Sequence, residues 1–130
     1  MKTLIVEDDF MSRLVLHELL KSYGPAHIAV NGNEAVEAAK LAIDSNAPYN
    51  LICLDIKMPE MDGQKALKEI RRLEDEGGIQ GLSRARVIMT TMLDDKDNIM
   101  SAFREQCDAY LVKPIGKNAL LEQLQKLELT

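Results

Sequence analysis

Residues 51–63 of the 130-residue chain read LICLDIKMPEMDG, an apolar run followed by an acid and a turn. A near-continuous apolar run such as Leu51 to Leu54 suits a strand that is covered on both faces. Asp55 ends this run, and Asp62 is a residue type that caps helices. The stretch therefore predicts a buried strand with an acid at its carboxyl end, followed by a helix that begins near Asp62.

The same alternation of short apolar runs and helical patterns extends along the chain. The strand-like runs are Leu4–Val6, His27–Val30, Leu51–Leu54, Val87–Thr90 and Ala109–Val112. Apolar residues at helical spacing lie between and after them. They are Met11, Leu14, Val15 and Leu19; Ala35, Ala38, Ala39 and Ala42; Ala66, Leu67, Ile70 and Leu73; Ile99, Met100 and Phe103; and Leu120, Leu121, Leu124 and Leu127.

Strands that alternate with helices indicate a parallel sheet with crossover helices. An eight-fold barrel would need about 250 residues, and this chain has 130. We therefore predict a doubly wound α/β domain, residues 1–130, with a five-stranded parallel sheet and five helices.

Composition narrows the class of protein. No apolar run approaches the roughly 18 residues of a membrane span, and the segment Met1 to Val6 enters the first strand without a signal peptide. We therefore expect a cytoplasmic protein, in which Cys53 and Cys107 stay reduced. The net charge of −5, with basic residues interspersed among acids, argues against direct nucleic-acid contact.

Polar side chains follow four of the five predicted strands. They are Glu7, Asp8 and Asp9; Asp55; Thr90 and Thr91; and Lys113. In an open α/β sheet, ligands bind beyond the carboxyl ends of the strands. Gathered carboxylates repel one another unless a cation neutralises them, and oxygen ligands without His or Cys favour Mg²⁺. A carboxylate can also accept a phosphoryl group, so the set predicts Mg²⁺-assisted phosphoryl transfer onto Asp55.

Over residues Lys2 to about Leu127, the sequence resembles CheY-type response-regulator receiver domains of two-component systems. The matching features are the acids after the first strand, Asp55 with Met58, Pro59, Met61, Asp62 and Gly63, then Thr91, Tyr110, Lys113 and Pro114. The resemblance implies the flavodoxin-like strand order 2-1-3-4-5. It also implies phosphorylation of Asp55 by a histidine kinase or a histidine phosphotransfer protein.

The resemblance also assigns a metal site. In the family, the acidic pair precedes an Arg on the first helix by five residues, so Arg13 makes Glu7 and Asp8 the pair. Asp8 would then bind Mg²⁺ directly and Glu7 through water. Asp55 would be a further ligand, and so would the backbone carbonyl of Lys57.

By the same resemblance, Thr91 and Lys113 would hold the phosphoryl oxygens. Thr90 is a rival hydroxyl, but the spacing to Lys113 favours Thr91. Thr91 and Tyr110 would form the switch, and the fourth helix, fifth strand and fifth helix, roughly Lys96 to Leu127, would bind a downstream protein.

Three further expectations follow from the family pattern. The peptide bond between Lys113 and Pro114 should be cis. Met92 departs from the Ala or Gly that is usual after the threonine, and the stretch from Leu73 to Arg86 is longer than usual. These departures affect kinetics and the choice of partner, and they leave the chemistry at Asp55 intact.

As a function, the resemblance implies a phosphorylation-activated response regulator that is not an enzyme toward external substrates. It would catalyse only its own phosphoryl transfer and slow autodephosphorylation, as a monomer or a phosphorylation-dependent dimer, without membrane or nucleic-acid contact. We expect a stand-alone protein; the alternative is a receiver module cut from a larger regulator with an output domain.

Two other functions are less compatible with these residues. A haloacid-dehalogenase-type phosphatase places a second Asp two residues after its nucleophile, where this chain has Lys57. A flavodoxin must hold a phosphate in its first loop, which here carries Glu7, Asp8 and Asp9 and would repel it.

Overall fold

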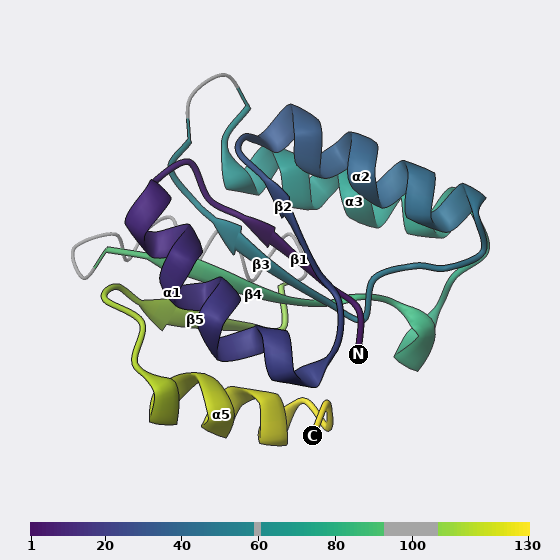
Figure 1. Cartoon of the computed structure of the whole chain (residues 1–130). Coiled ribbons are helices and arrows are strands. Elements are labelled where there is room, and N and C mark those ends of the chain that lie inside the picture. The colour runs from purple at the N-terminus through teal and green to yellow at the C-terminus, as the bar shows by residue number, and fades with distance from the viewer. Residues whose placement is uncertain (59–60, 93–106) are drawn as a thin grey trace.

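A computed structural model describes residues 1–58, 61–92 and 107–130 of the chain. Its five strands form one parallel sheet in the order β2-β1-β3-β4-β5 (Figure 1). The strands are β1 (Thr3–Val6), β2 (Ala26–Ala29), β3 (Leu51–Asp55), β4 (Arg86–Thr91) and β5 (Ala109–Val112). The predicted fold class and strand order are therefore confirmed.

Helices cover both faces of this sheet. Within the described residues they are α1 (Phe10–Leu20), α2 (Gly32–Asp44), α3 (Gly63–Glu76) and α5 (Lys117–Lys126), with short 3-10 turns at Lys21–Tyr23 and Gly81–Ser83. Figure 1 places α2 and α3 on one face and α1 and α5 on the other. The predicted fourth helix, marked by Ile99, Met100 and Phe103, lies outside the described residues, as does Pro59.

The central strand β3 supplies both halves of the core. Because successive side chains on a strand point to opposite faces, Ile52 and Leu54 pack with α2 and α3, while Leu51 and Cys53 pack with α1 and α5. All five residues of β3 are buried, as predicted for a strand that is covered on both faces. Its carboxyl end therefore places Asp55 at the centre of the sheet edge.

The edge strand β2 departs from the prediction. It runs from Ala26 to Ala29, one residue earlier than the predicted His27–Val30, and His27 and Ile28 are exposed. An edge strand has a neighbour on one side only, so less of its surface is covered. An apolar run therefore does not mark a strand that is covered on both faces in the case of β2.

The predicted apolar face of α1 is wrong at three of its four residues. Met11, Leu14 and Val15 are exposed, whereas the fourth, Leu19, is partly buried and packs against the core. The fully buried residues of the helix are Leu16 and Leu20, each 1% exposed. The segment is apolar on more than one side, so helical spacing alone could not select the buried side. The helix therefore presents apolar side chains to solvent.

The apolar faces predicted for α2 and α3 are borne out. Ala35, Ala39 and Ala42 of α2 are buried, and so are Ala66, Leu67 and Ile70 of α3. Side chains cap both helices, because Asn31 accepts a bond from the Glu34 amide (2.8 Å) and Asp62 accepts one from the Lys65 amide (2.9 Å). The predicted helix start at Asp62 is therefore confirmed.

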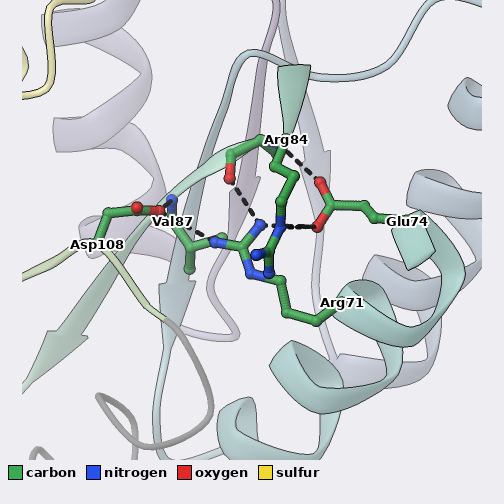
Figure 2. Close-up of polar contacts among 6 residues, drawn as sticks. Arg71, Glu74, Arg84, Val87 and Asp108 are labelled. Carbon is green, nitrogen blue, oxygen red and sulfur yellow. Dashed lines mark hydrogen bonds and ion pairs between the residues drawn. The ribbon is translucent and has the colours of Figure 1, made fainter. Parts of the chain in front are cut away.

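A buried ionic network ties α3 to the amino ends of β4 and β5 (Figure 2). Asp55 lies at the other end of the strands, at the carboxyl end of β3. Arg71 Nη1 donates to Glu74 Oε1 (2.7 Å) and to the Ala85 carbonyl (2.8 Å), and Nη2 donates to Asp108 Oδ2 (3.0 Å). Arg71 and Glu74 are 5% and 2% exposed. Charges buried so deeply are tolerated only when they are paired.

The same network satisfies backbone groups where β4 begins. Asp108 Oδ2 accepts a bond from the Val87 amide (2.7 Å), and Glu74 Oε2 accepts one from the Ala85 amide (2.7 Å). Arg84 Nε lies 3.6 Å from Glu74 Oε1. The network thereby anchors the end of the long connection between α3 and β4.

Within the described residues, each helix is too short or too polar to cross a membrane.

Candidate metal and phosphoacceptor site

Three carboxylates meet at the carboxyl edge of the sheet. Glu7 and Asp8 directly follow β1, and Asp55 is the last residue of β3. Their carboxylate oxygens lie within 4.8 Å of one another. Glu7 is 0% exposed and Asp55 is 5% exposed, whereas Asp8 is exposed. The group is therefore open to solvent on the Asp8 side.

Lys113, which follows β5, reaches into this acidic group. Its Nζ lies 2.7 Å from Glu7 Oε2 and 3.2 Å from Asp55 Oδ2. The peptide bond between Lys113 and Pro114 is cis, as predicted. Glu7 Oε2 is buried and lies against this ammonium group, so Glu7 and Lys113 form a buried ion pair at the site.

The third acid of the run, Asp9, has a structural role. Its side chain caps α1 by accepting a bond from the Ser12 amide (2.9 Å), and this bond lowers the pKa of Asp9. Arg13 Nη1 donates to the carbonyls of Glu7 (3.2 Å) and Asp8 (3.0 Å). The structure thus places Glu7 and Asp8, and not Asp9, beside Asp55.

Burial and charge shape the protonation of the two central groups. Burial raises the pKa of Asp55 to about 7; the neighbouring charge of Glu7 adds to this effect, and Lys113 partly opposes it. Burial by itself lowers the pKa of Lys113, but the contacts with Glu7 and Asp55 outweigh burial and raise it. Lys113 is therefore a cation at neutral pH, and protonation of Asp55 is poised near neutrality in the metal-free protein.

The two threonines that end β4 are both buried, at 1% for Thr90 and 2% for Thr91. Thr91 Oγ1 donates to the Met92 carbonyl (3.3 Å). Thr90 is the register partner of Asp55, but its hydroxyl is buried and has no hydrogen bond among the described residues. Sequence spacing favours Thr91 over Thr90 as the hydroxyl of the site, and the structure places both threonines at the end of the strand beside Asp55.

The remaining predicted residues lie at the rim of the site or beyond it. Lys57 is exposed, two residues after Asp55. Tyr110 is 41% exposed on the edge strand β5. The structure therefore brings Glu7, Asp8, Asp55 and Lys113 together and leaves Tyr110 at the surface.

The donor set fits Mg²⁺. Hard carboxylate oxygens of Glu7, Asp8 and Asp55 converge, and Asp8 is accessible to water. Mg²⁺ prefers oxygen ligands and keeps several waters, so a few carboxylates at an open edge suit it. His or Cys, the ligands of softer metals, are absent from this group.

The exposed face of α1 is the feature that sequence analysis missed. Phe10, Met11, Leu14 and Val15 are between 41% and 64% exposed. A hollow of about 190 Å³ beside this face is lined by residues of α1 and of the segment after β5. These residues are Met11, Ser12, Val15, Lys113, Pro114 and Ile115. An apolar surface therefore borders Lys113, the residue whose ammonium group contacts Asp55.

A parallel sheet in the order 2-1-3-4-5, with an acid at the end of its central strand and a lysine beyond the fifth, defines a receiver domain. The model of the response regulator receiver domain family matches residues 3–125, and the chain belongs to this family. It is 32% identical over 127 residues to the chemotaxis protein CheY of Bacillus subtilis (strain 168), covering 96% of this chain and 95% of that protein.

Solved structures agree with this assignment. The receiver domain of the histidine kinase CKI1 from Arabidopsis thaliana, complexed with Mg²⁺ and BeF₃⁻, matches with a TM-score of 0.84 and 26% identity, over 99% of this chain and 90% of that one. The Saccharomyces cerevisiae co-crystal structure of the phosphotransfer protein Ypd1 and the receiver domain of Ssk1 matches with a TM-score of 0.81 and 26% identity, over 98% and 88%. The chain is therefore a receiver domain of two-component signalling.

Proposed function

We propose that this receiver domain accepts a phosphoryl group on Asp55 from a histidine kinase or a histidine phosphotransfer protein. It then signals through a changed protein-binding surface. One observation carries the proposal: Asp55, at the end of β3, lies 3.2 Å from Lys113 Nζ and among the oxygens of Glu7 and Asp8. A nucleophilic carboxylate needs a cationic environment when it meets a phosphoryl group, and Lys113 supplies part of it.

The transfer itself needs few protein groups. A carboxylate oxygen of Asp55 attacks the phosphorus atom, and the P–N bond of the donor's phosphohistidine breaks. The electron pair of that bond stays on the imidazole. Lys113 and Thr91 would hold the phosphoryl oxygens, which take over the lysine contact that Asp55 has in the free protein.

Mg²⁺ is the proposed cofactor. Glu7, Asp8, Asp55 and the backbone carbonyl of Lys57 would hold it, with Glu7 acting through water. When bound, the ion would neutralise negative charge shared by the carboxylates and the phosphoryl group. The CKI1 receiver domain complexed with Mg²⁺ and BeF₃⁻ supports this choice of cofactor.

The output of the switch would be binding of another protein. Thr91 would turn toward the phosphoryl group, and Tyr110, which is 41% exposed, would move inward. The output surface would include β5 and α5, together with residues near Lys96 that the structure does not describe. The protein would act on no external substrate, and its own phosphoryl group would leave slowly.

The apolar face of α1 supports a protein as the donor. Met11 and Val15 line the hollow that Lys113 also lines, so a protein seated there would deliver its phosphohistidine beside Asp55. A small donor would not need this face. The co-crystal structure of Ypd1 with the Ssk1 receiver domain supports a phosphotransfer protein as the donor class.

We also propose that this receiver domain is located in the cytoplasm, since its buried thiols Cys53 and Cys107 are unpaired.

Intact-protein mass spectrometry tests the phosphoacceptor. Acetyl phosphate with Mg²⁺ should add one phosphoryl group to the native protein and none to Asp55→Asn. Asp9→Asn is the matched control, because Asp9 caps α1 and Asn caps equally well, so it should be phosphorylated normally. A phosphorylated Asp55→Asn protein would refute the assignment.

A second comparison tests the donor. Met11→Ser combined with Val15→Ser should slow transfer from a phosphorylated histidine phosphotransfer protein and leave the acetyl phosphate rate unchanged. Leu41→Ser is the control, because Leu41 is 60% exposed on α2, on the other face of the sheet. Equal slowing with both donors would mean that the α1 face does not bind the donor protein.

A further inference from the structure

The first residue of α2 lies against the loop that follows the phosphoacceptor strand. A Cβ atom built on Gly32 would lie 2.4 Å from the Met61 carbonyl oxygen and 2.9 Å from Met61 Cβ and Cγ. Real Cβ contacts are essentially never shorter than 3.0 Å. Any side chain at position 32 would therefore displace either the backbone at Met61 or the start of α2.

Local backbone conformation does not explain this glycine. Among the described glycines, positive φ occurs at Gly24, Gly78 and Gly81 and not at Gly32. Gly32 begins a helix that Asn31 already caps, and its φ is not positive, so its backbone conformation does not call for glycine. What requires a glycine here is the close approach of the Met61 backbone.

The loop that Gly32 contacts is fixed firmly at its two ends. The Gly63 amide donates to the Ile56 carbonyl (2.8 Å), which closes the loop from Ile56 to Gly63. A Cβ on Gly63 would lie 2.1 Å from the Asp55 carbonyl oxygen, so α3 also begins directly against the phosphoacceptor residue. Between these ends, Met61 is partly buried and packs on the core beside α2 and α3.

We propose that Gly32 is a positioning residue for the metal site. By letting α2 approach Met61, it sets the position of Met61 and of the adjacent Gly63, whose amide is bonded to Ile56, the residue before Lys57. The inference rests on the proposed function, because Lys57 is a ligand only if Mg²⁺ binds beside Asp55. Gly32 itself would touch neither the metal nor the phosphoryl group.

The test compares Gly32→Ala with Gly116→Ala. Gly116 has ordinary backbone geometry and open space around its Cβ position, so it controls for the change of residue type. In metal-free protein, Gly32→Ala should shift the Ile56, Lys57 and Gly63 amide resonances and speed hydrogen exchange at the Gly63 amide. Titration with MgCl₂ should give about tenfold weaker binding, which is typical when a residue that supports a metal ligand is changed. Gly116→Ala should match the native protein in both measurements.

The outcomes separate this inference from the proposed function. If the native protein binds no Mg²⁺, the metal site of the proposed function fails. If the native protein binds Mg²⁺ and Gly32→Ala binds it equally well, the inference is overturned, whether or not the loop resonances shift.

A second variant covers the case in which Gly32→Ala does not fold. Met61→Ala removes atoms from the loop side of the same contact and cannot clash. It should also weaken Mg²⁺ binding, while Leu82→Ala, which truncates an exposed side chain in the turn before β4, should not. Native Mg²⁺ affinity in Met61→Ala would then overturn the inference.

Discussion

Lys113 Nζ lies 2.7 Å from Glu7 Oε2, although the two residues follow strands β5 and β1, which β3 and β4 separate in the sheet. The Glu7 side chain is wholly buried, so its charge depends on this ammonium group. Lys113 Nζ also lies 3.2 Å from Asp55 Oδ2. One side chain therefore compensates two carboxylates in the metal-free protein.

Replacing Lys113 by Met should destabilise the metal-free protein and tighten Mg²⁺ binding. Removing one partner of a buried ion pair costs about 3 kcal/mol, and the remaining carboxylates attract a cation more strongly. Urea unfolding in EDTA and MgCl₂ titration measure the two effects. Lys126→Met is the control, since its exposed pair with Glu122 should contribute at most about 1 kcal/mol. Unchanged Mg²⁺ affinity in Lys113→Met would contradict this account.

Stability of the metal-free protein should fall as pH rises from about 4 to about 7. Asp55 has a pKa of about 7 in the folded protein, above its ordinary value of 3.8. The folded state therefore holds a proton that the unfolded state has lost in this range, and raising the pH favours unfolding. Urea unfolding at several pH values in EDTA measures the slope, which Asp55→Asn should reduce. An identical slope in both proteins would assign the titration to other groups.

The acidic run offers a test of which acid binds the metal. Asp8→Asn should reduce the rise in melting temperature that Mg²⁺ produces, because Asp8 is the accessible carboxylate of the group. Asp9→Asn should leave that rise unchanged, since Asp9 caps α1 and Asn can replace it there. The reverse pattern in differential scanning calorimetry would move the site to Asp9.

The fold could be predicted from sequence wherever the order of apolar and polar residues fitted only one arrangement of buried side chains. The run Leu51 to Leu54 is apolar on both faces and is followed by Asp55, and it alternates with helical patterns, so the strand and its terminal acid were predicted correctly. In α1, apolar residues occur on more than one side of the helix. Helical spacing alone predicted that Met11, Leu14 and Val15 are buried, and these residues are exposed. Only the packing of Leu16 and Leu20 decides which side is buried.

The candidate site also has features that the sequence predicts and features that it does not. Side chains at strand ends converge because parallel strands end at one edge, so the grouping of Glu7, Asp55 and Lys113 follows from topology. Close backbone approaches leave little trace in a single sequence, since a glycine such as Gly32 reads simply as a helix start. The buried pair of Arg71 and Asp108 joins residues that are far apart in the chain, and local patterns do not reveal it.

The buried ionic network should contribute far more to stability than the exposed ion pairs on the same helix. Arg71→Met would leave Glu74 and Asp108 without their shared partner, at a cost of about 3–5 kcal/mol. Arg72→Met removes two exposed pairs, with Glu69 and Glu76, and should cost about 1 kcal/mol or less. Chemical unfolding of the two variants compares adjacent arginines directly, and similar losses would mean that the network is not a major support of the fold.

Met92 should slow loss of the phosphoryl group from Asp55. Its side chain follows Thr91 and is 55% exposed, so it is free to lie over the approach to the phosphoryl group. Hydrolysis needs a water aligned opposite the bond that breaks, and a thioether can exclude a water without positioning one. Met92→Ala should therefore lose its phosphoryl group faster, and it should also gain one faster from acetyl phosphate, because both reactions use the same approach.

The decay of phosphorylated protein after removal of the donor measures this effect, and a tenfold change in rate corresponds to about 1.4 kcal/mol. Leu82→Ala is the control: it truncates an apolar side chain that is 81% exposed in the turn before β4, at the amino ends of the strands. It should leave both rates unchanged, because the acceptor lies at the carboxyl ends. If Met92→Ala decays at the native rate or more slowly, Met92 does not obstruct the water. Faster decay together with an unchanged rate of uptake would mean that the thioether affects only the alignment of water.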